Sequence, residues 1–298
     1  MNADFMKFFP EYLRKCFLQV HIKPKTINEI RIRINRPVIV NVNNTEVYIN
    51  ETGLVFDAAK GYCMQQREFH KMMECMCNYS LYAYEEELKQ GYLTIEGGHR
   101  AGVCGSMIVK DNKVYGIRNI TCMNLRISNE WKGCADELVG HLRKQGLMNV
   151  LIISAPGKGK TTLLRDLIRQ ISDDTKHFPG ISISLIDERG EIASCLQGIP
   201  QKDVGIRTDV YDGCPKTEGL MMAVRSMGPG LLAIDEIGGE DDIRALSYAG
   251  RCGCYVFATV HGEDLAELEQ KPWIGMLLKQ NFFQEKILIT GKGRYHCL

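Results

Sequence analysis

The stretch from Asn149 to Arg165 constrains the fold of this chain more than any other. It reads NVLIISAPGKGKTTLLR: an apolar run, a turn with two glycines, Lys160 and Thr161, and the start of a helical pattern. This order is typical of a strand, a phosphate-binding loop and a helix, in which backbone N–H groups and the positive end of the helix attract phosphate. In such a loop the lysine reaches the outer phosphates, and the threonine hydroxyl contacts Mg²⁺.

The helix after this loop is predicted independently of the motif. Apolar residues recur on one face, at Leu163, Leu164, Leu167, Ile168 and Ile171. The first glycine of the usual pattern is replaced by Ser154, where a tight exit from the strand matters more than close approach of a ligand. We therefore expect nucleotide contacts from Pro156, Gly157, Lys158, Gly159, Lys160, Thr161 and Thr162, with Thr161 also a metal ligand.

Composition indicates a soluble globular protein without a strong charge. The chain has 298 residues, 45% hydrophobic and 24% charged, with a net charge of +1. This length allows two domains, and the charge gives no general reason to expect nucleic acid as a partner. No apolar run approaches the roughly 18 residues that span a bilayer, and the first residues lack a secretory pattern. We expect a cytoplasmic location and no transmembrane segment.

The twelve cysteines are dispersed, with no C-x-x-C and only two C-x-C pairs, Cys75/Cys77 and Cys252/Cys254. Cytosolic thiols stay reduced, and isolated cysteines behave as small apolar residues. We predict that these side chains fill the core and form no zinc site.

Residues 1–132 are predicted to form a small α+β domain. Glu29–Ile34 alternates strictly between apolar and polar residues, as in a half-buried strand, and Asn43–Asn44 indicates a hairpin. Gln65–Lys89 has helical character with a break near Asn78. Glycine-separated short strands are expected in Gly91–Gly105 and Val114–Arg118.

Residues 133–298 are predicted to form a doubly wound α/β domain. A helix between Gly133 and Gly146 leads into the strand before the loop. Further short apolar runs are typical of buried parallel strands: Ile181–Ile186, Leu231–Ile234, Tyr255–Thr259 and Ile287–Thr290. Ligands of such sheets bind at the carboxyl ends of the strands.

Acidic residues follow two of these runs. Asp235, at the end of a buried strand, suits a metal site, and Glu236 beside it suits a general base. Glu188 and Glu191 follow another strand and are candidates to act on water or the metal, although a solvated loop would have the same composition. His261 leaves a third strand end, where a polar group can sense the outer phosphate.

Three arginines, Arg189, Arg207 and Arg225, lie near these acidic segments in the sequence. A positive charge on a transferring phosphoryl group is worth roughly 10³–10⁵ in rate. Any of the three could act within a subunit or across a subunit interface, and the sequence does not rank them.

With these residues identified, the chain resembles the stage III sporulation protein AA family of endospore-forming Firmicutes. That family is similar to the ATPases of type II and type IV secretion and of pilus retraction. The segments that carry the resemblance are Gly97–Gly102, Gly116–Thr121, Gly159–Asp166, Ile186–Ala193, Arg225–Pro229, Ile234–Ile237 and Ala258–His261.

The resemblance implies a RecA-like P-loop NTPase domain with a mainly parallel sheet at 133–298, preceded by the small α+β domain. Asp187–Glu191 is similar to the family's acidic box, in which a glutamate activates water. His261 matches the histidine box. Asp235–Glu236 matches Walker B, although secretion ATPases often have glycine where Asp235 stands. Arg225, as a catalytic group, and Arg207, as a nucleotide contact, match a region of phosphate-contacting arginines.

Such ATPases form hexameric rings with ATP and Mg²⁺ near the junction of their two domains. The resemblance therefore implies a ring of this chain at the cytosolic mouth of a channel from mother cell to forespore. The ring would power assembly of the channel or transport through it, with membrane proteins of the complex as partners.

Other functions remain open from the residues alone. A nucleotide-responsive, non-catalytic scaffold would also keep the loop, although it has no need of Glu236. A nucleic-acid motor is supported only by Arg31, Arg33 and Arg36 and by the loop at His99–Arg100. A small-molecule kinase is a weaker option, because no lid or substrate pocket pattern is visible.

Overall fold

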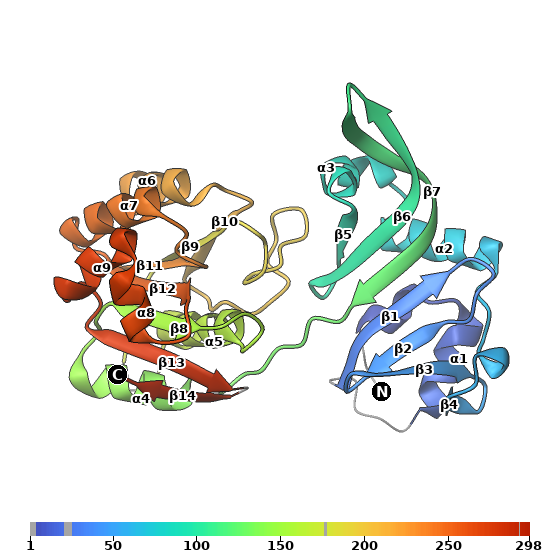
Figure 1. Ribbon diagram of the computed structural model, residues 1–298, viewed down its shortest axis with the longest axis horizontal. Helices are drawn as coiled ribbons and strands as arrows, with labels where there is room; N and C mark the ends of the chain where they lie inside the picture. The colour runs from blue at the N-terminus through green and yellow to red at the C-terminus, as the bar shows by residue number, and fades with distance from the viewer. Residues whose placement is uncertain (1–3, 21–25, 176–177, 292) are drawn as a thin grey trace. The chain divides into compact units, whose positions relative to one another are not determined.

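The computed structural model describes residues 4–20, 26–175, 178–291 and 293–298. Contacts divide the chain into two compact units, Met1–Asn129 and Glu130–Leu298. Each unit has its own sheet (Figure 1).

The first unit is built on an antiparallel sheet of order β4-β3-β2-β1-β7-β6-β5. Its strands are β1 (Ile27–Arg33), β2 (Ile39–Val42), β3 (Thr45–Asn50), β4 (Gly53–Val55), β5 (Tyr92–Ile95), β6 (His99–Lys110) and β7 (Lys113–Arg126). The helices with it are α1 (Glu11–Gln19), α2 (Gln66–Met76) and α3 (Glu85–Lys89).

Two local features of this unit were predicted from the sequence and are confirmed. Asn43 and Asn44 both have positive φ, as a tight hairpin turn between β2 and β3 requires. Asn78 and Tyr79 also have positive φ, and they lie between α2 and α3, where the helical pattern breaks.

The prediction of short strands separated by glycines is wrong for β6 and β7. These strands have 12 and 14 residues and form one long hairpin. Gly102, Gly105 and Gly116 lie inside the strands instead of ending them. At Gly105 a Cβ atom would come 2.6 Å from the carbonyl oxygen of Asn119, so the irregular pairing there needs a residue without a side chain.

The second unit has a sheet of order β10-β9-β11-β12-β8-β13-β14. Its strands are β8 (Val150–Ser154), β9 (Ile183–Asp187), β10 (Thr208–Asp212), β11 (Leu231–Ile234), β12 (Tyr255–His261), β13 (Glu285–Gly291) and β14 (Arg294–Cys297). Neighbouring strands are parallel except β13 and β14. The edge strands β10 and β14 are absent from the sequence-based prediction, because neither is an apolar run.

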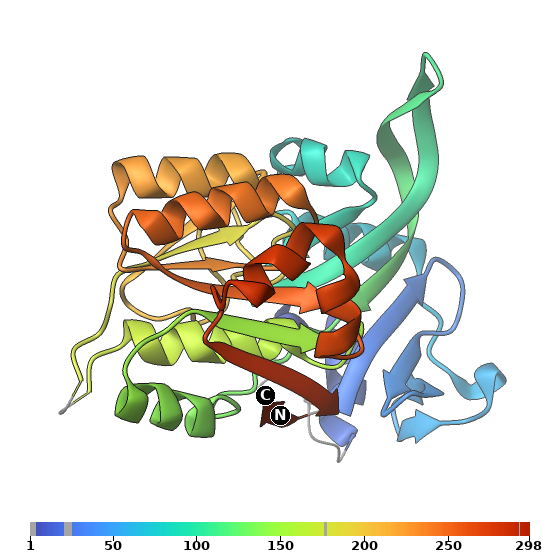
Figure 2. The same cartoon turned by 60° about the vertical axis from the view of Figure 1, so that its left-hand side comes forward.

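Helices cover both faces of this sheet (Figure 2). One face carries α4 (Asp136–Gln145) and α5 (Lys160–Ser172). The other carries α6 (Lys216–Ser226), α7 (Glu240–Arg251), α8 (Leu265–Gln270) and α9 (Pro272–Lys279). Buried strands between two helical layers define an α/β fold, as predicted.

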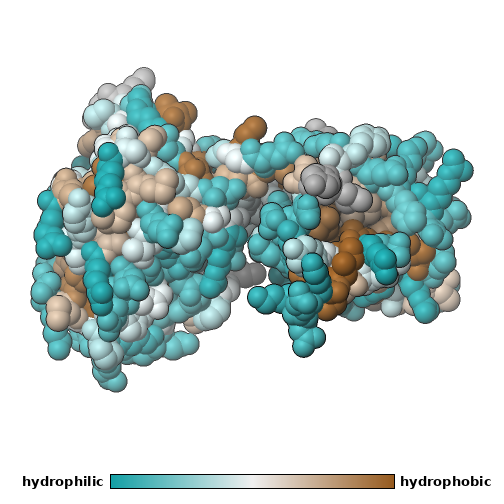
Figure 3. Space-filling model, turned by 90° about the horizontal axis from the view of Figure 1, so that it is seen from above, coloured by the Kyte–Doolittle hydropathy of each residue, from teal (hydrophilic) through white to brown (hydrophobic). Residues whose placement is uncertain are grey.

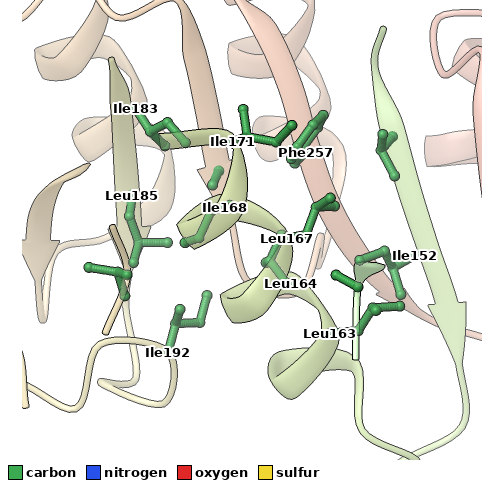
Figure 4. Close-up of a cluster of buried hydrophobic side chains, with 14 of the residues drawn as sticks. Ile152, Leu163, Leu164, Leu167, Ile168, Ile171, Ile183, Leu185, Ile192 and Phe257 are labelled. Atoms are coloured by element: carbon green, nitrogen blue, oxygen red, sulfur yellow. The ribbon is translucent and has the colours of Figure 1, made fainter. Parts of the chain in front are cut away.

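The apolar stripe predicted on α5 is the core of one layer. Its leucines and isoleucines point at Ile152 of β8, Ile183 of β9 and Phe257 of β12 (Figure 4). Successive residues of β8 alternate between the layers, with Ile152 packed toward α5 and Leu151 and Ile153 toward the opposite helices. This packing fixes the direction of α5, and with it the position of the loop that precedes the helix.

The prediction that the cysteines fill the core holds for only a third of them. Cys16, Cys77, Cys195 and Cys254 are buried, and the other eight are exposed or half-buried. All twelve are free thiols. The C-x-C pairs lie at the ends of α2 and α7, where the chain turns and cannot bury both side chains.

Candidate functional site

The loop between β8 and α5 has the geometry of an anion-binding site. Gly157 and Gly159 have φ of 74° and 108°, values that favour glycine, and a Cβ atom on either would meet open space. No side chain caps the amino end of α5 at Gly159. The first N–H groups of this 13-residue helix therefore lack helical partners and face outward with the positive end of the helix dipole. Pro156 and Lys158 are exposed in this loop, and Thr161 and Thr162 are half-buried in the first turn.

Lys160 lies beneath this loop and not in solvent. Its side chain is buried, and its Nζ donates to the carbonyl oxygen of Ser154 at 3.2 Å. The Nζ also lies 2.7 Å from Nδ1 of His261, at the end of β12. Burial lowers the pKa of Lys160, while the carboxylates of Glu236, Asp235 and Glu191 act in the opposite direction. The lysine is thus a buried amine whose charged form three nearby carboxylates favour.

His261 joins Lys160 to Glu236. Its Nε2 lies 3.2 Å from Oε2 of Glu236, and Arg189 Nη1 lies 3.5 Å from the same oxygen. If Lys160 donates to Nδ1, the histidine is neutral with its proton on Nε2, and this proton is directed at Glu236. The carboxylate of Glu236 therefore has two donors in this state.

Glu236 also has an unusual backbone. Its φ is 39°, in the left-handed region that residues with side chains rarely adopt. Its N–H donates to Oγ1 of Thr259 at 3.0 Å, and Ile237 N–H donates to the carbonyl of Thr259. These bonds to β12 hold the strained residue in place. Strain of this kind concentrates at functional sites.

Asp235 is a buried acid at this edge of the sheet. It is 9% exposed, and the Thr259 hydroxyl donates to its Oδ1 at 3.2 Å. Burial, followed by the charges of Glu191 and Asp187, raises the pKa of Asp235 to about 6. A buried carboxylate with few donors and a raised pKa is one that a bound cation would stabilise.

The acidic segment after β9 is organised by Asp187. This side chain is fully buried and accepts from the N–H groups of Glu191, Ile192 and Ala193 at 2.8–3.1 Å. Arg165 of α5 is also buried and donates to the carbonyl oxygens of Ile192 and Glu191 at 2.5 and 2.6 Å. Asp187 and Arg165 thus position the backbone that carries the exposed Glu191.

Glu188 has a different neighbour. Its carboxylate pairs with Lys216, at the start of α6, at 3.0 Å. Of the two glutamates predicted in this segment, Glu191 affects the pKa values of Lys160 and Asp235, whereas Glu188 faces α6.

The structure does not bring Arg207 and Arg225 to this site within one chain. Arg207 precedes β10 and donates to the carbonyl of Ser172 and to Asp174, beyond the carboxyl end of α5. This end of the helix is about 18 Å from Lys160 at 1.5 Å per residue. Arg225 is exposed in the last turn of α6, which leads to the amino end of β11. Both arginines are at the sheet edge away from the loop, because helix and strand directions alternate in this fold.

A cavity of about 440 Å³ adjoins the loop on the side of β13 and β14. Gly157, Gly159 and Thr162 form one wall, and Trp131 and Arg294 contribute flat side chains. Cys134, Lys158, Leu163, Ile289, Gly293 and Tyr295 complete the lining. The volume and the mixture of apolar, aromatic and cationic groups suit a planar heterocycle attached to a phosphate chain.

Sequence reasoning missed several features that organise the site. Arg165 was not predicted as a site residue, and Asp187 was predicted only as part of the acidic segment. Both act on backbone groups, a role that no sequence motif indicates. Trp131, Arg294 and Tyr295 come from opposite ends of the second unit and meet only in the fold.

The fold and site therefore define an α/β protein with a glycine-bearing anion-binding loop at the start of a helix and acidic strand ends beside it. Among the described residues, no helix is both long and apolar enough to cross a membrane. Residues 2–295 match the model of the family described as sporulation stage III, protein AA. The chain belongs to that family. It is 42% identical over 268 residues to stage III sporulation protein AA of Bacillus subtilis, which covers 90% of this chain and 84% of that protein.

Solved structures with a similar fold include a pilus retraction motor and an ATPase. The pilus retraction motor PilT with bound ADP aligns with a TM-score of 0.58 at 14% identity, over 93% of this chain and 76% of that one. The ATPase DotB of Legionella pneumophila aligns with a TM-score of 0.54 at 15% identity, over 88% of this chain and 72% of that one. At such low identity these matches establish the fold, and the resemblance predicted from the sequence motifs is confirmed at that level.

Proposed function

We propose that this protein is a Mg²⁺-dependent ATPase. The observation that carries the proposal is the convergence on one sheet edge of the anion-binding loop, the buried Lys160, and the acids Asp235 and Glu236. A site that only binds phosphate needs the loop and the lysine. The strained Glu236, held by His261 and Arg189, adds a carboxylate that can orient and deprotonate water.

The phosphates would contact the N–H groups of Gly157–Thr162, and Lys160 would reach the outer phosphates from below. The hydroxyl of Thr161 and the carboxylate of Asp235 would hold Mg²⁺. Asp235 fits this role because it is buried, has a pKa raised to about 6, and accepts a hydrogen bond from the hydroxyl of Thr259. The metal supplies positive charge to the transferring phosphoryl group.

The residues around Lys160 provide a response to nucleotide. Phosphate that pairs with Lys160 competes with Nδ1 of His261, which the lysine contacts in this structure. Once its contact with Lys160 is lost, the imidazole of His261 can rotate, and its Nε2 then moves relative to Glu236. The hydrogen bonding of the proposed general base would therefore depend on whether the outer phosphate is bound. Glu236 is the best placed base, and Glu191 and Glu188 are the next candidates in that order.

The cavity beside the loop would hold the base of the nucleotide. Arg294 can stack on an aromatic ring, and Trp131 can cover the opposite side. Adenine fits the apolar lining, because its ring offers two flat faces for stacking.

The family and fold support a role in a sporulation complex. We propose a ring of identical subunits, hexameric as in the secretion ATPases, that drives assembly of a channel or transport through it. Residues 1–132 would form one moving domain and 133–298 the ATPase domain. Membrane proteins of the complex, in the mother cell, would be its partners. Arg207 and Arg225, remote from the site of their own subunit, are proposed to act at subunit interfaces.

The test is hydrolysis of Mg-ATP by the purified full-length chain, with molar mass measured in the same buffer with and without nucleotide. Lys160→Ala should lose nucleotide binding, and Glu236→Gln should bind ATP but lower turnover by at least about 10²-fold. Exposed residues supply matched controls, Lys144→Ala and Glu240→Gln, which should behave as wild type.

The outcomes separate the competing functions. Turnover retained in Lys160→Ala would show that Lys160 does not bind the phosphates and would contradict the proposed site. Tight ATP binding without turnover in the wild-type ring would favour the non-catalytic scaffold. Turnover that rises with added nucleic acid and falls steeply with salt would favour the nucleic-acid motor.

A further inference from the structure

The outer part of the β6–β7 hairpin, residues 106–118, is the most exposed apolar segment of the first unit. The hairpin extends beyond the rest of its sheet (Figure 1). The pairing of β6 with β5 covers only His99–Gly102, and that of β7 with β1 covers only Cys122–Arg126. Among the described residues, no other strand pairs with the outer hairpin. Apolar side chains are nevertheless exposed there, at Met107, Ile108, Val109, Val114 and Tyr115.

The register of the hairpin separates these side chains by face. Met107 is opposite Ile117, and Val109 is opposite Val114, so these two pairs share one face. We call this set of four residues the apolar face. The register shifts between Ile108 and Val109, so that Tyr115 of β7 has no partner on β6. Because of this extra residue, the pair Val109–Val114 lies on the same face as the pair Met107–Ile117. Three of the four side chains are about half exposed, from 47% to 59%.

The opposite face is basic. Ser106 pairs with Arg118, Ile108 with Gly116, and Lys110 with Lys113. We call Lys110, Lys113 and Arg118 the basic face. None of these three forms an ion pair within the described parts of the chain, whereas Lys89 of the neighbouring α3 is paired with Glu85 and Glu86. Three basic residues against Asp111 give residues 106–118 a charge of +2, more than the +1 of the whole chain.

The pair of lysines next to the turn indicates the charge of a surface that would bind the outer hairpin. Like charges directly opposite on neighbouring strands destabilise a hairpin, and Lys110 and Lys113 are opposite next to the turn. An anionic surface removes this repulsion, while a neutral or basic one does not. Figure 3, seen from the side on which the hairpin projects in Figure 1, shows hydrophobic side chains bordered by hydrophilic ones over this unit.

We propose that the outer hairpin lies on an anionic lipid surface. The apolar face would enter the boundary between headgroups and acyl chains, and the lysine and arginine side chains would extend around it to the lipid phosphates. Tyr115 suits the same boundary, because its ring is apolar and its hydroxyl is polar. Free backbone groups at both strand edges remain solvated in the headgroup layer, as they could not be in the hydrocarbon interior.

A lipid surface accounts for both faces together. A second copy of the chain would cover the apolar face but leave the basic face, on the opposite side of the hairpin, without an anionic partner. An acidic protein would satisfy the charges, and it is an outcome that the experiment separates. This inference goes beyond the proposed ATPase activity and does not depend on it, because the hairpin belongs to the first unit and the nucleotide site to the second.

The test is flotation of the full-length chain with vesicles of phosphatidylcholine alone, or with about one-third phosphatidylglycerol. The wild type should float with the anionic vesicles only, and less as salt increases. Lys110→Glu with Lys113→Glu should lower partitioning by at least about tenfold, since each basic group near such a surface contributes to the attraction. Met107→Thr with Val109→Thr should lower it similarly while keeping strand propensity.

Matched controls lie elsewhere in the first unit. Phe56→Thr removes a more exposed apolar side chain, and Lys60→Glu reverses an exposed charge outside the hairpin. Both should float as the wild type does. Circular dichroism and the melting temperature show whether each hairpin variant is folded.

Three results would overturn the proposal. The first is a wild type that does not float with anionic vesicles, which would leave an acidic protein as the partner of the hairpin. The second is flotation that persists in folded hairpin variants. The third is a fall in molar mass in the hairpin variants with unchanged vesicle binding, which would assign the hairpin to contacts between copies. ATP hydrolysis measured on the same samples keeps this test separate from that of the nucleotide site.

Discussion

Lys160 Nζ lies 2.7 Å from Nδ1 of His261, although 101 residues separate the two in the chain. The contact joins the loop of β8 to the end of β12, and Glu236 extends it at 3.2 Å. The lysine that would bind phosphate is thus already engaged, and its partner is already in contact with the proposed base. A phosphate bound to Lys160, as proposed, would therefore compete with its contact to His261.

We expect His261→Ala to separate binding from turnover. Without the imidazole, Lys160 remains beneath the loop through Ser154, so the Kd for ATP should change by less than about fivefold. Turnover should fall by about 10²-fold or more, because Glu236 loses one of its two donors and its orientation. The measurement is equilibrium binding beside steady-state hydrolysis, with His70→Ala on α2 as the control. Equal losses in binding and turnover would argue for a purely structural histidine.

Asp235 is expected to lower the stability of the nucleotide-free protein at neutral pH. Its pKa is raised from 3.8 to about 6 in the folded state, mainly by burial. The folded protein therefore binds this proton more tightly than the unfolded chain does. The favourable contribution is complete below pH 4 and is lost as pH rises through 6, at a cost of about 3 kcal/mol above that range.

Asp235→Asn should consequently be more stable than the wild type at pH 8, by up to about 3 kcal/mol, and the difference should shrink as pH falls from 6 to 4. Urea unfolding at several pH values measures this. The same variant should lose the stabilisation that Mg-ATP gives the wild type. A variant that is less stable at pH 8 would show that the carboxylate is paired in the free protein.

Arg165 is predicted to matter for the acidic segment through its position and not through phosphate. Its buried guanidinium donates to the carbonyls of Glu191 and Ile192. Arg165→Met should lower the free energy of unfolding by about 2–4 kcal/mol, because the buried carbonyl of Ile192 and the partly buried carbonyl of Glu191 lose their donor. Thermal or urea unfolding tests this, with the exposed Arg251→Met as control. An unchanged stability would mean that these carbonyls find water in the folded protein.

Trp131 should report nucleotide binding. It lines the cavity beside Gly157 and Gly159 and is 55% exposed, whereas Trp273 on α9 is outside this cavity. ADP should quench the fluorescence of the wild type and of Trp273→Phe, and the change should vanish in Trp131→Phe. Arg294→Ala should weaken ADP binding by about fivefold to tenfold while leaving inorganic phosphate binding unchanged. A fluorescence change that disappears in Trp273→Phe and persists in Trp131→Phe would place the adenine ring outside this cavity.

Cys104 and Cys122 are directly opposite each other on β6 and β7. Opposite residues of antiparallel strands have Cα atoms about 4.5–5.5 Å apart, within the range of a disulfide. Oxidised glutathione should therefore bridge them by exchange before any other pair in the first unit. Peptide mapping by mass spectrometry checks this, and Cys104→Ser removes the bridge. A folded protein that forms no Cys104–Cys122 bridge would contradict the expected register.

The sequence by itself determined the α/β class, the strand-loop-helix motif and the acidic residues at the strand ends. These are local patterns: apolar runs of strand length, a glycine turn, and a 3.6-residue stripe on α5. It also located the turn at Asn43–Asn44, because asparagine tolerates positive φ. Each of these follows from a few neighbouring residues, and so each could be predicted before any contact was known.

The tertiary structure decided which of the candidates meet. His261 contacts Lys160 because β12 lies beside β8 in the sheet, and no local pattern states that order. Arg207 and Arg225 lie at the other edge because β10, α5 and α6 run in directions that only the assembled sheet defines. The two long strands of the hairpin depended on cross-strand pairing, which outweighed the weak strand propensity of their glycines. Pairing and packing between distant segments, and not local propensity, therefore set the site and the exposed hairpin.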